Sequence, residues 1–191
     1  MFLGTPPDPS WQQYSGWQYY EMPQSLYQSD RIHVRWCAQF GPSILQSALD
    51  GGKLLIMHRN TPDRVPNPRV IAHLHNYSAS GRQLYSANNI DNNPPNPPLF
   101  TLDDKTGEWL CFEIGVSQAN NTRQFWATVQ GGSEVLLQTE PLNRTDGMWT
   151  GGVEFGFWGP VANVGPDSWW KLDELVISNA KIGPPPGFAA P

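Results

Sequence analysis

Residues 31–40 alternate strictly between apolar and other side chains, a pattern that few folds can accommodate. The segment reads RIHVRWCAQF, and its apolar positions are Ile32, Val34, Trp36, Ala38 and Phe40. Side chains two residues apart lie on the same face of a β-strand, so this period of two predicts a strand with one face in a core and the other outside it.

Seven further segments alternate or run apolar in a similar way, with turn-rich stretches between them. They are residues 53–58, 69–77, 108–117, 123–130, 134–139, 152–158 and 169–178. The 18 Gly and 19 Pro residues suit turns and short extended segments better than helices. We therefore expect one all-β domain in these 191 residues, an antiparallel sandwich or barrel.

The two ends of the chain differ in composition from the segments between them. Residues 1–28 are rich in Pro, Gln, Tyr and Trp without periodicity, and residues 184–191 are rich in Pro, which favours extended geometry. We expect a Pro-rich N-terminal arm (1–28), a β-sandwich domain (29–183) and a Pro-rich C-terminal tail (184–191). Such arms indicate contacts with protein neighbours in a larger assembly.

Charge and hydropathy exclude two classes of partner. The net charge is −5 with acids and bases scattered, so no basic surface is expected for nucleic acid. No run of about 18 apolar residues occurs, so we expect no membrane partner. The opening residues lack a basic segment followed by an apolar one, and we expect no signal peptide in this chain.

The two cysteines, Cys37 and Cys111, lie inside alternating segments and not in a Cys-x-x-Cys pair. Metal binding through sulfur is therefore not expected. A disulfide is one alternative, but small core residues are the commoner role of strand cysteines, and we expect two separate buried thiols.

Three segments, in this order, resemble the concanavalin A-like lectin and glucanase superfamily, in particular its polysaccharide-lyase-like jelly rolls. They are GGKLLIM (51–57), GEWLCFEIGV with RQFWATVQGG (107–132), and WWKLDELVISNAKIG (169–183). The resemblance implies a two-sheet antiparallel jelly-roll sandwich. It also implies that the concave face of one sheet holds a glycan, either for cleavage or for binding.

A lyase of this kind cleaves an acidic glycan by β-elimination, which needs a charge neutraliser, a base and an acid. The candidate side chains alternate along two predicted strands, and they are His73, His75 and Tyr77 on one, with His33, Arg35 and Gln39 on the other. However, the chain has neither the Gln-x-His strand nor the Tyr-x-Lys-x-Gly-x-Tyr segment of alginate-lyase relatives. We therefore expect these side chains to contact sugar or support the fold.

Glycosidases of the superfamily instead use two carboxylates on one strand, typically in a Glu-x-Asp-x-x-Glu pattern. This chain lacks that pattern. Asp173 and Glu174 are adjacent and are expected on opposite faces of their strand, whereas Glu113 and Glu154 are isolated within apolar strands. Each is expected to be a hydrogen-bonded structural carboxylate.

Tryptophans within the strand patterns are expected in the core, whereas Trp149 and Trp158 can present their rings to a sugar. The combined interpretation is a non-catalytic, lectin-like, carbohydrate-binding protein that serves as a structural or decorating component of a larger assembly, such as a phage virion. We expect it outside the cell or on a virion surface, with no cofactor and no metal. The alternative is a polysaccharide lyase acting on an acidic glycan by β-elimination.

Overall fold

A computed structural model of the chain describes ten stretches of it. They are residues 16–21, 24–26, 29–42, 52–58, 70–77, 83–87, 100–102, 105–141, 152–157 and 169–190. One sheet has six strands, and for most of it the structure describes the strand pairing but not the side chains. No helix among the described residues is long and apolar enough to cross a membrane.

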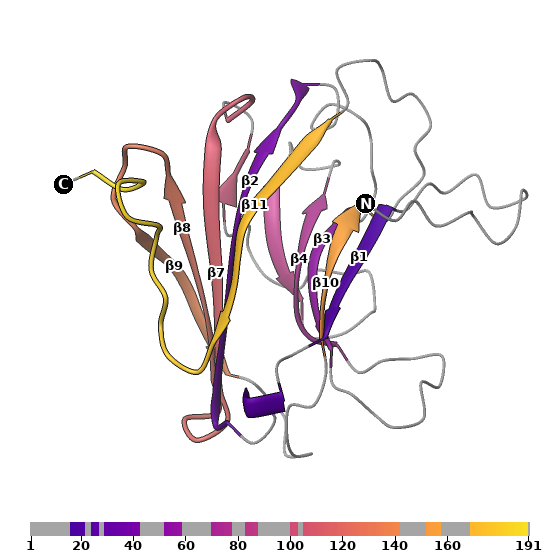
Figure 1. Cartoon of the computed structure of the whole chain (residues 1–191), viewed down its shortest axis with the longest axis vertical. Helices are drawn as coiled ribbons and strands as arrows, with labels where there is room; N and C mark the ends of the chain where they lie inside the picture. Colours follow the sequence, from indigo (N-terminus) through magenta and orange to yellow (C-terminus); the bar gives the residue numbers. More distant parts are fainter. Residues whose placement is uncertain are drawn as a thin grey trace, which may run out of the picture.

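The strands form two sheets that stack as layers, and each described strand pair is antiparallel (Figure 1). The six-stranded sheet has the order β1 (Gly16–Glu21), β10 (Gly152–Phe157), β3 (Gly52–His58), β4 (Val70–Tyr77), β5 (Gln83–Ala87) and β6 (Phe100–Thr101). The five-stranded sheet has the order β11 (Trp170–Ser178), β2 (Arg31–Phe40), β7 (Trp109–Ser117), β8 (Thr122–Val129) and β9 (Val135–Pro141). A short 3₁₀ helix, η1 (Gln24–Leu26), precedes β2.

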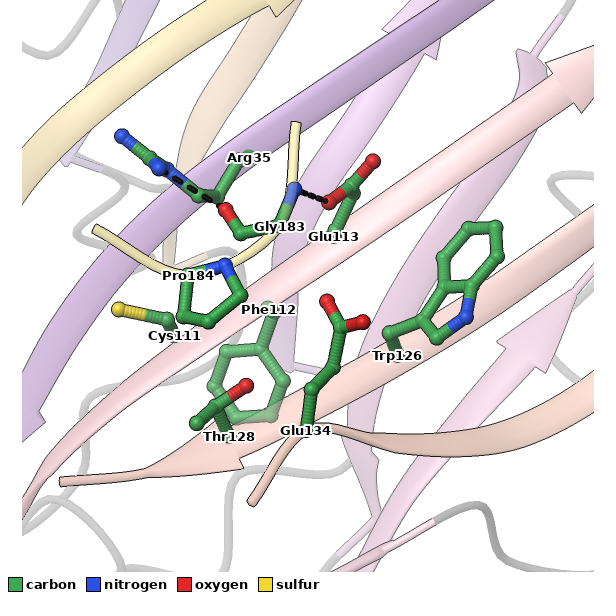
Figure 2. Close-up of a pocket in the computed structure, with 9 residues that line it drawn as sticks. All are labelled: Arg35, Cys111, Phe112, Glu113, Trp126, Thr128, Glu134, Gly183 and Pro184. Atoms are coloured by element: carbon green, nitrogen blue, oxygen red, sulfur yellow. Dashed lines mark hydrogen bonds between the residues drawn. The ribbon is translucent and has the colours of Figure 1, made fainter. Parts of the chain in front are cut away.

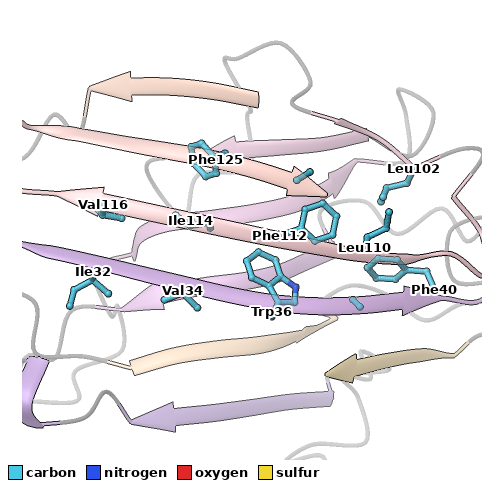
Figure 3. Packing of buried hydrophobic residues seen from close by; sticks show 12 residues of the cluster. Ile32, Val34, Trp36, Phe40, Leu102, Leu110, Phe112, Ile114, Val116 and Phe125 are labelled. Atoms are coloured by element: carbon cyan, nitrogen blue, oxygen red, sulfur yellow. The ribbon is translucent and has the colours of Figure 1, made fainter. Parts of the chain in front are cut away.

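The core lies between the sheets, on the inner face of the five-stranded sheet (Figure 3). The alternation that predicts a strand at 31–40 is confirmed, because each of its apolar positions is fully buried. Leu102, which follows β6, also belongs to this cluster. Strands β7 and β8 add Leu110, Phe112, Ile114, Val116 and Phe125. The rings of Trp36 and Phe112 pack with their centroids 5.4 Å apart.

A buried ion pair joins β8 to the edge strand β9. Arg123, with no exposed surface, donates to Glu140, which is 6% exposed. The Arg123 guanidinium lies 5.7 Å from the centroid of the Phe125 ring on the same face of β8. Arg123 and Glu140 are direct register partners, and a shifted register would leave a buried charge unpaired, which is costly.

The eight predicted strands are confirmed. Strands β1, β5 and β6 are not predicted by the sequence pattern. Strand β6 has two residues and β5 has five, too few to show a period. The sequence interpretation assigned Gly16–Glu21 to the N-terminal arm, but these residues are β1, which pairs with β10 along its whole length. This part of the predicted arm therefore pairs with the six-stranded sheet.

The expectation of two free thiols is wrong, because Cys37 and Cys111 form a disulfide. The two residues are direct register partners on β2 and β7, with their Cα atoms 4.0 Å apart. Residues that face each other in this way bring their sulfur atoms within bonding reach. Each strand segment suits a small buried residue, but only the pairing of the strands reveals that the two cysteines meet.

Candidate functional site

The outer face of the five-stranded sheet carries a grid of polar side chains. On β2 the residues that alternate with the core are His33, Arg35, Cys37 and Gln39, and their register partners on β7 are Gly115, Glu113, Cys111 and Trp109. On β8 the matching row contains Gln124, Trp126 and Thr128. Because the sheet is antiparallel with a period of two, each row brings together side chains from strands far apart in the sequence.

Residues 181–190, here called the C-terminal strap, cover much of this face. In Figure 1 the yellow strap runs along the side of the five-stranded sheet that points away from the six-stranded sheet. Its far end is held by two backbone hydrogen bonds at the β8–β9 turn, from Gly131 N to Phe188 O (2.8 Å) and from Ala190 N to Gly132 O (3.0 Å). The sequence interpretation placed 184–191 outside the sandwich, whereas residues 184–190 lie against it.

The carboxylate of Glu113 anchors the near end of the strap. It accepts a hydrogen bond from Gly183 N (2.8 Å), which Figure 2 shows. It also accepts one from Ile182 N (3.0 Å), and its other partner is His33 Nδ1 at 2.7 Å. Lys181 Nζ lies 3.7 Å from the same carboxylate. Two successive backbone amides that point at one anion form a strong site for a charge.

These contacts also set the protonation of Glu113. Burial raises the pKa of Glu113, since a charge is poorly solvated there. Hydrogen bonds from His33, Ile182 and Gly183, together with the positive charge of Lys181, lower the pKa by more than burial raises it. The net pKa therefore lies below the ordinary value of 4.5, and Glu113 is ionised at neutral pH.

Arg35 forms the second anchor of the strap. Its Nη1 donates to the carbonyl of Gly183 (2.9 Å), and its Nη2 donates to Glu174 (3.1 Å). The Arg35 side chain is only 7% exposed. The guanidinium is thus committed to contacts within the chain.

A β-bulge in β11 brings two acidic residues to the same face. The register with β2 shifts between Asp173 and Val176, and Glu174 has a φ of 55°. Such a bulge adds an unpaired residue and turns its side chain. The expectation that Asp173 and Glu174 lie on opposite faces is therefore wrong, because both line one groove on the outer face.

That groove lies between the sheet and the far half of the strap, with a volume of about 290 Å³. Its main lining residues are Trp109, Gln130, Asp173, Glu174, Pro185 and Phe188. It contains two carboxylates and no basic side chain. General acid–base catalysis needs a base and an acid poised on a substrate, whereas both carboxylates of this lining are exposed.

His33 occupies its place because residue 115 is a glycine. A Cβ atom at Gly115 would lie 2.5 Å from His33 Cε1 and 2.9 Å from Trp126 Cζ3. The rings of His33 and Trp126 pack over this position with their centroids 5.9 Å apart. Lys181 Nζ lies 4.7 Å from the centroid of the Trp126 ring.

Comparison with known proteins gives matches in structure alone. No family model matches the sequence, and no curated protein matches it. A lectin from Bauhinia forficata, solved in complex with GalNAc, aligns with a TM-score of 0.53 at 11% identity, over 91% of this chain and 84% of its own. The architecture and these alignments together decide the fold. The fold is a concanavalin A-like jelly roll.

Two other structures share this jelly roll. The binding domain of botulinum neurotoxin serotype D aligns with a TM-score of 0.55 at 11% identity, over 90% of this chain and 40% of that chain. A GH131 beta-glucanase catalytic domain from Podospora anserina aligns with a TM-score of 0.51 at 9% identity, over 90% of this chain and 72% of its own. This chain thus spans less than half of the neurotoxin chain, and at such identities the likeness concerns the fold.

The jelly roll separates the site residues predicted from the sequence. Arg35 and Gln39 lie on β2 in the five-stranded sheet, whereas His73, His75 and Tyr77 lie on β4 in the six-stranded sheet. The two sets are therefore on different layers and do not form one site. Trp149 and Trp158 lie outside the described residues.

Within the five-stranded sheet, Gln39 has a structural role. Its Nε2 donates to Gly107 O (2.6 Å), and its Oε1 accepts from Lys171 Nζ (3.1 Å). Sequence analysis missed the roles of Lys181 and Gly183, whose importance comes from the path of the strap. It did identify Glu113 as a hydrogen-bonded carboxylate, because an acid isolated in an apolar strand needs a partner. The expected hydrogen bond of Glu174 is the one from Arg35.

Proposed function

We propose that this concanavalin A-like jelly roll is a non-catalytic, lectin-like protein that binds a glycan. The observation that carries the proposal is the separation of the polar candidates between two layers (Figure 1). A β-elimination site needs its neutraliser, base and acid around one sugar ring. Arg35 and Gln39 on β2 cannot complete such a set with residues of β4, since the core lies between the two sheets.

The contacts on the outer face of the five-stranded sheet support a structural role for that face. Arg35 is engaged by Gly183 and Glu174, and Glu113 is engaged by the strap amides. A uronate carboxylate would have to displace these partners before Arg35 neutralised its charge. Arg35 and Glu113 therefore hold the strap in place in this fold.

The six-stranded sheet is our proposed glycan-binding layer. His73, His75 and Tyr77 occupy alternate positions of β4, a central strand that pairs with β3 and β5. Trp149 precedes β10 and Trp158 follows it, so both adjoin the same sheet in sequence. The GalNAc complex of the Bauhinia forficata lectin supports glycan binding as a use of this fold.

Affinity electrophoresis and a glycan array test this proposal. The variants H73A and Y77F are expected to weaken binding by about tenfold each, the equivalent of about 1.4 kcal/mol. Q39A, on the other sheet, is the matched control and should bind like the parent. Failure of the parent to retain any glycan at about 1 mM sites, or equal weakening by Q39A, would overturn the proposal.

The lyase remains the second candidate, because His73, His75 and Tyr77 share one strand. Its test is the ultraviolet absorbance of unsaturated uronate on incubation with alginate, glucuronan, heparin or hyaluronan. The non-catalytic proposal expects no product. Product formation that H73A and Y77F abolish would establish the lyase instead.

The finer part of the proposal is a decorating role in a larger assembly, such as a phage virion, at an extracellular or virion surface. Residues 16–21 and 184–190 are engaged within the chain, so the Pro-containing residues 1–15 are the part of the arms that supports contacts with protein neighbours. The disulfide supports an oxidising location. Light scattering of the purified chain, alone and mixed with particles of its source, tests this role. A strictly monomeric chain that binds no particle would overturn it.

A further inference from the structure

A small polar pocket lies on the outer face beside the strap, and no strap residue lines it. Its volume is about 70 Å³, which suits a group of a few heavy atoms. The side chains that give it its chemistry are Arg31, His33, Ser117, Asn120, Thr122 and Gln124. They come from β2, β7, β8 and the turn between the last two.

Each of these six side chains can donate a hydrogen bond, and no Asp or Glu lines the pocket. Ser117 Oγ accepts from Asn120 N (3.2 Å), which leaves its hydroxyl hydrogen for another acceptor. Gln124 uses one of its amide hydrogens on Thr139 (3.2 Å) and retains the second. A lining of donors with a guanidinium among them is complementary to an anion.

His33 is held in place before any ligand arrives. Its Nδ1 is bonded to Glu113 (2.7 Å), so Nε2 is the ring nitrogen left for a ligand, and no contact of Nε2 is seen with the described residues. The carboxylate holds the ring in one orientation, and Nε2 donates to an anion when both ring nitrogens carry protons. Gly115 gives the ring its space, since a Cβ there would lie 2.7 Å from Nδ1.

We propose that this pocket binds an oxyanion, a carboxylate or sulfate group, between the guanidinium of Arg31 and the imidazole of His33. The fixed ring and the small volume favour a compact anion over an extended one. The oxyanion can be free in solution or carried on an acidic saccharide. The pocket is on the other layer from β4, so this inference holds whether or not the six-stranded sheet binds a glycan.

Titrations of the whole protein at constant ionic strength test the inference. The readout is the ¹⁵N signal of the His33 side chain, assigned with H33Q, on addition of sodium sulfate, sodium glucuronate or a sulfated oligosaccharide. We expect a saturable shift in the parent. Because Arg31 supplies a charged hydrogen bond, R31Q should weaken the affinity by at least about tenfold.

The matched control is K171Q, which removes one exposed positive charge at the other end of the same sheet face. It should change the affinity by less than about twofold, as expected for a screened surface charge. G115A should abolish binding by displacing the imidazole, and R31Q serves as the test if G115A fails to fold. A shift that never saturates, or equal weakening by K171Q and R31Q, would overturn the proposal.

The three ligands also separate the two sources of the anion. Equal affinity for sulfate, glucuronate and the oligosaccharide means that the pocket takes a free oxyanion. Affinity at least about tenfold higher for the oligosaccharide means that the sugar adds contacts of its own. Both results support the oxyanion site, whereas binding of none of the three contradicts it.

Discussion

Cys37 and Cys111 face each other on adjacent strands and are joined by a disulfide beneath the C-terminal strap. The bond closes a loop with a sequence separation of 74 residues. Replacing both cysteines by alanine should lower the free energy of unfolding by roughly 2–4 kcal/mol, chiefly because the unfolded chain regains freedom. Urea denaturation measures the loss, and circular dichroism should show an unchanged fold, since β2 and β7 remain paired.

The same bond predicts that the denatured, unreduced protein contains no reactive thiol. Titration with a thiol reagent checks this. Two titratable thiols per chain would mean that the cysteines are free in the purified protein.

Gly115 should not tolerate even a methyl group. G115A would force the rings of His33 and Trp126 away from positions 2.5–2.9 Å from the new atom, and overpacking of this kind costs about 1–3 kcal/mol. Combining G115A with H33A should recover part of the loss. Additive effects of the two changes would show that His33 does not occupy the space above residue 115.

Glu113 should make the stability of the protein depend on acid. Its folded pKa lies below 4.5, so its contribution is fully present above the unfolded pKa and is lost as the pH falls through the folded pKa. E113Q should lose about 2–4 kcal/mol at neutral pH and show a shallower decline in acid. Urea denaturation between about pH 7 and about pH 3 gives both quantities.

E134Q is the matched control for that series. Glu134 lies at the surface and pairs with Lys181 at 2.6 Å. An exposed pair contributes under about 1 kcal/mol, so E134Q should follow the parent curve. A larger loss of unfolding free energy in E134Q than in E113Q would contradict the role of burial.

Hydrogen exchange should show the strap docked at two independent points. The amides of Ile182 and Gly183 are expected to exchange at least about tenfold faster in E113A than in the parent, because their acceptor is gone. The amides of Gly131 and Ala190, bonded at the far end, should retain most of their protection. Equal loss of amide protection at both ends of the strap would mean that the strap docks as one unit.

Local pattern was enough to predict which residues of β2 enter the core, because burial follows the period of two. It was not enough to interpret the other face, where His33, Cys37 and Glu113 gain their roles only from the register of β2 with β7. The sequence of Leu172–Leu175 does not predict a bulge either. The positive φ of Glu174 nevertheless determines where the two carboxylates lie.

The strap likewise has one property that the local sequence predicts and one that it does not. Repeated prolines predict an extended backbone, and the strap lacks regular secondary structure over 181–190. Which surface it covers depends on Glu113 and Arg35, residues that lie about 70 and 150 positions earlier. Local composition does not predict contacts between residues so far apart in the sequence.

Among the described strands, β9 pairs with β8 alone, and its Val135 and Leu136 are 54% and 50% exposed. If it detaches, the backbone of β8 becomes an open template for a strand from another molecule. The shelf life of concentrated protein should then depend on fraying of this one strand, well before the sandwich as a whole unfolds. Replacing Val135 by lysine is the change most suited to a protein meant for storage.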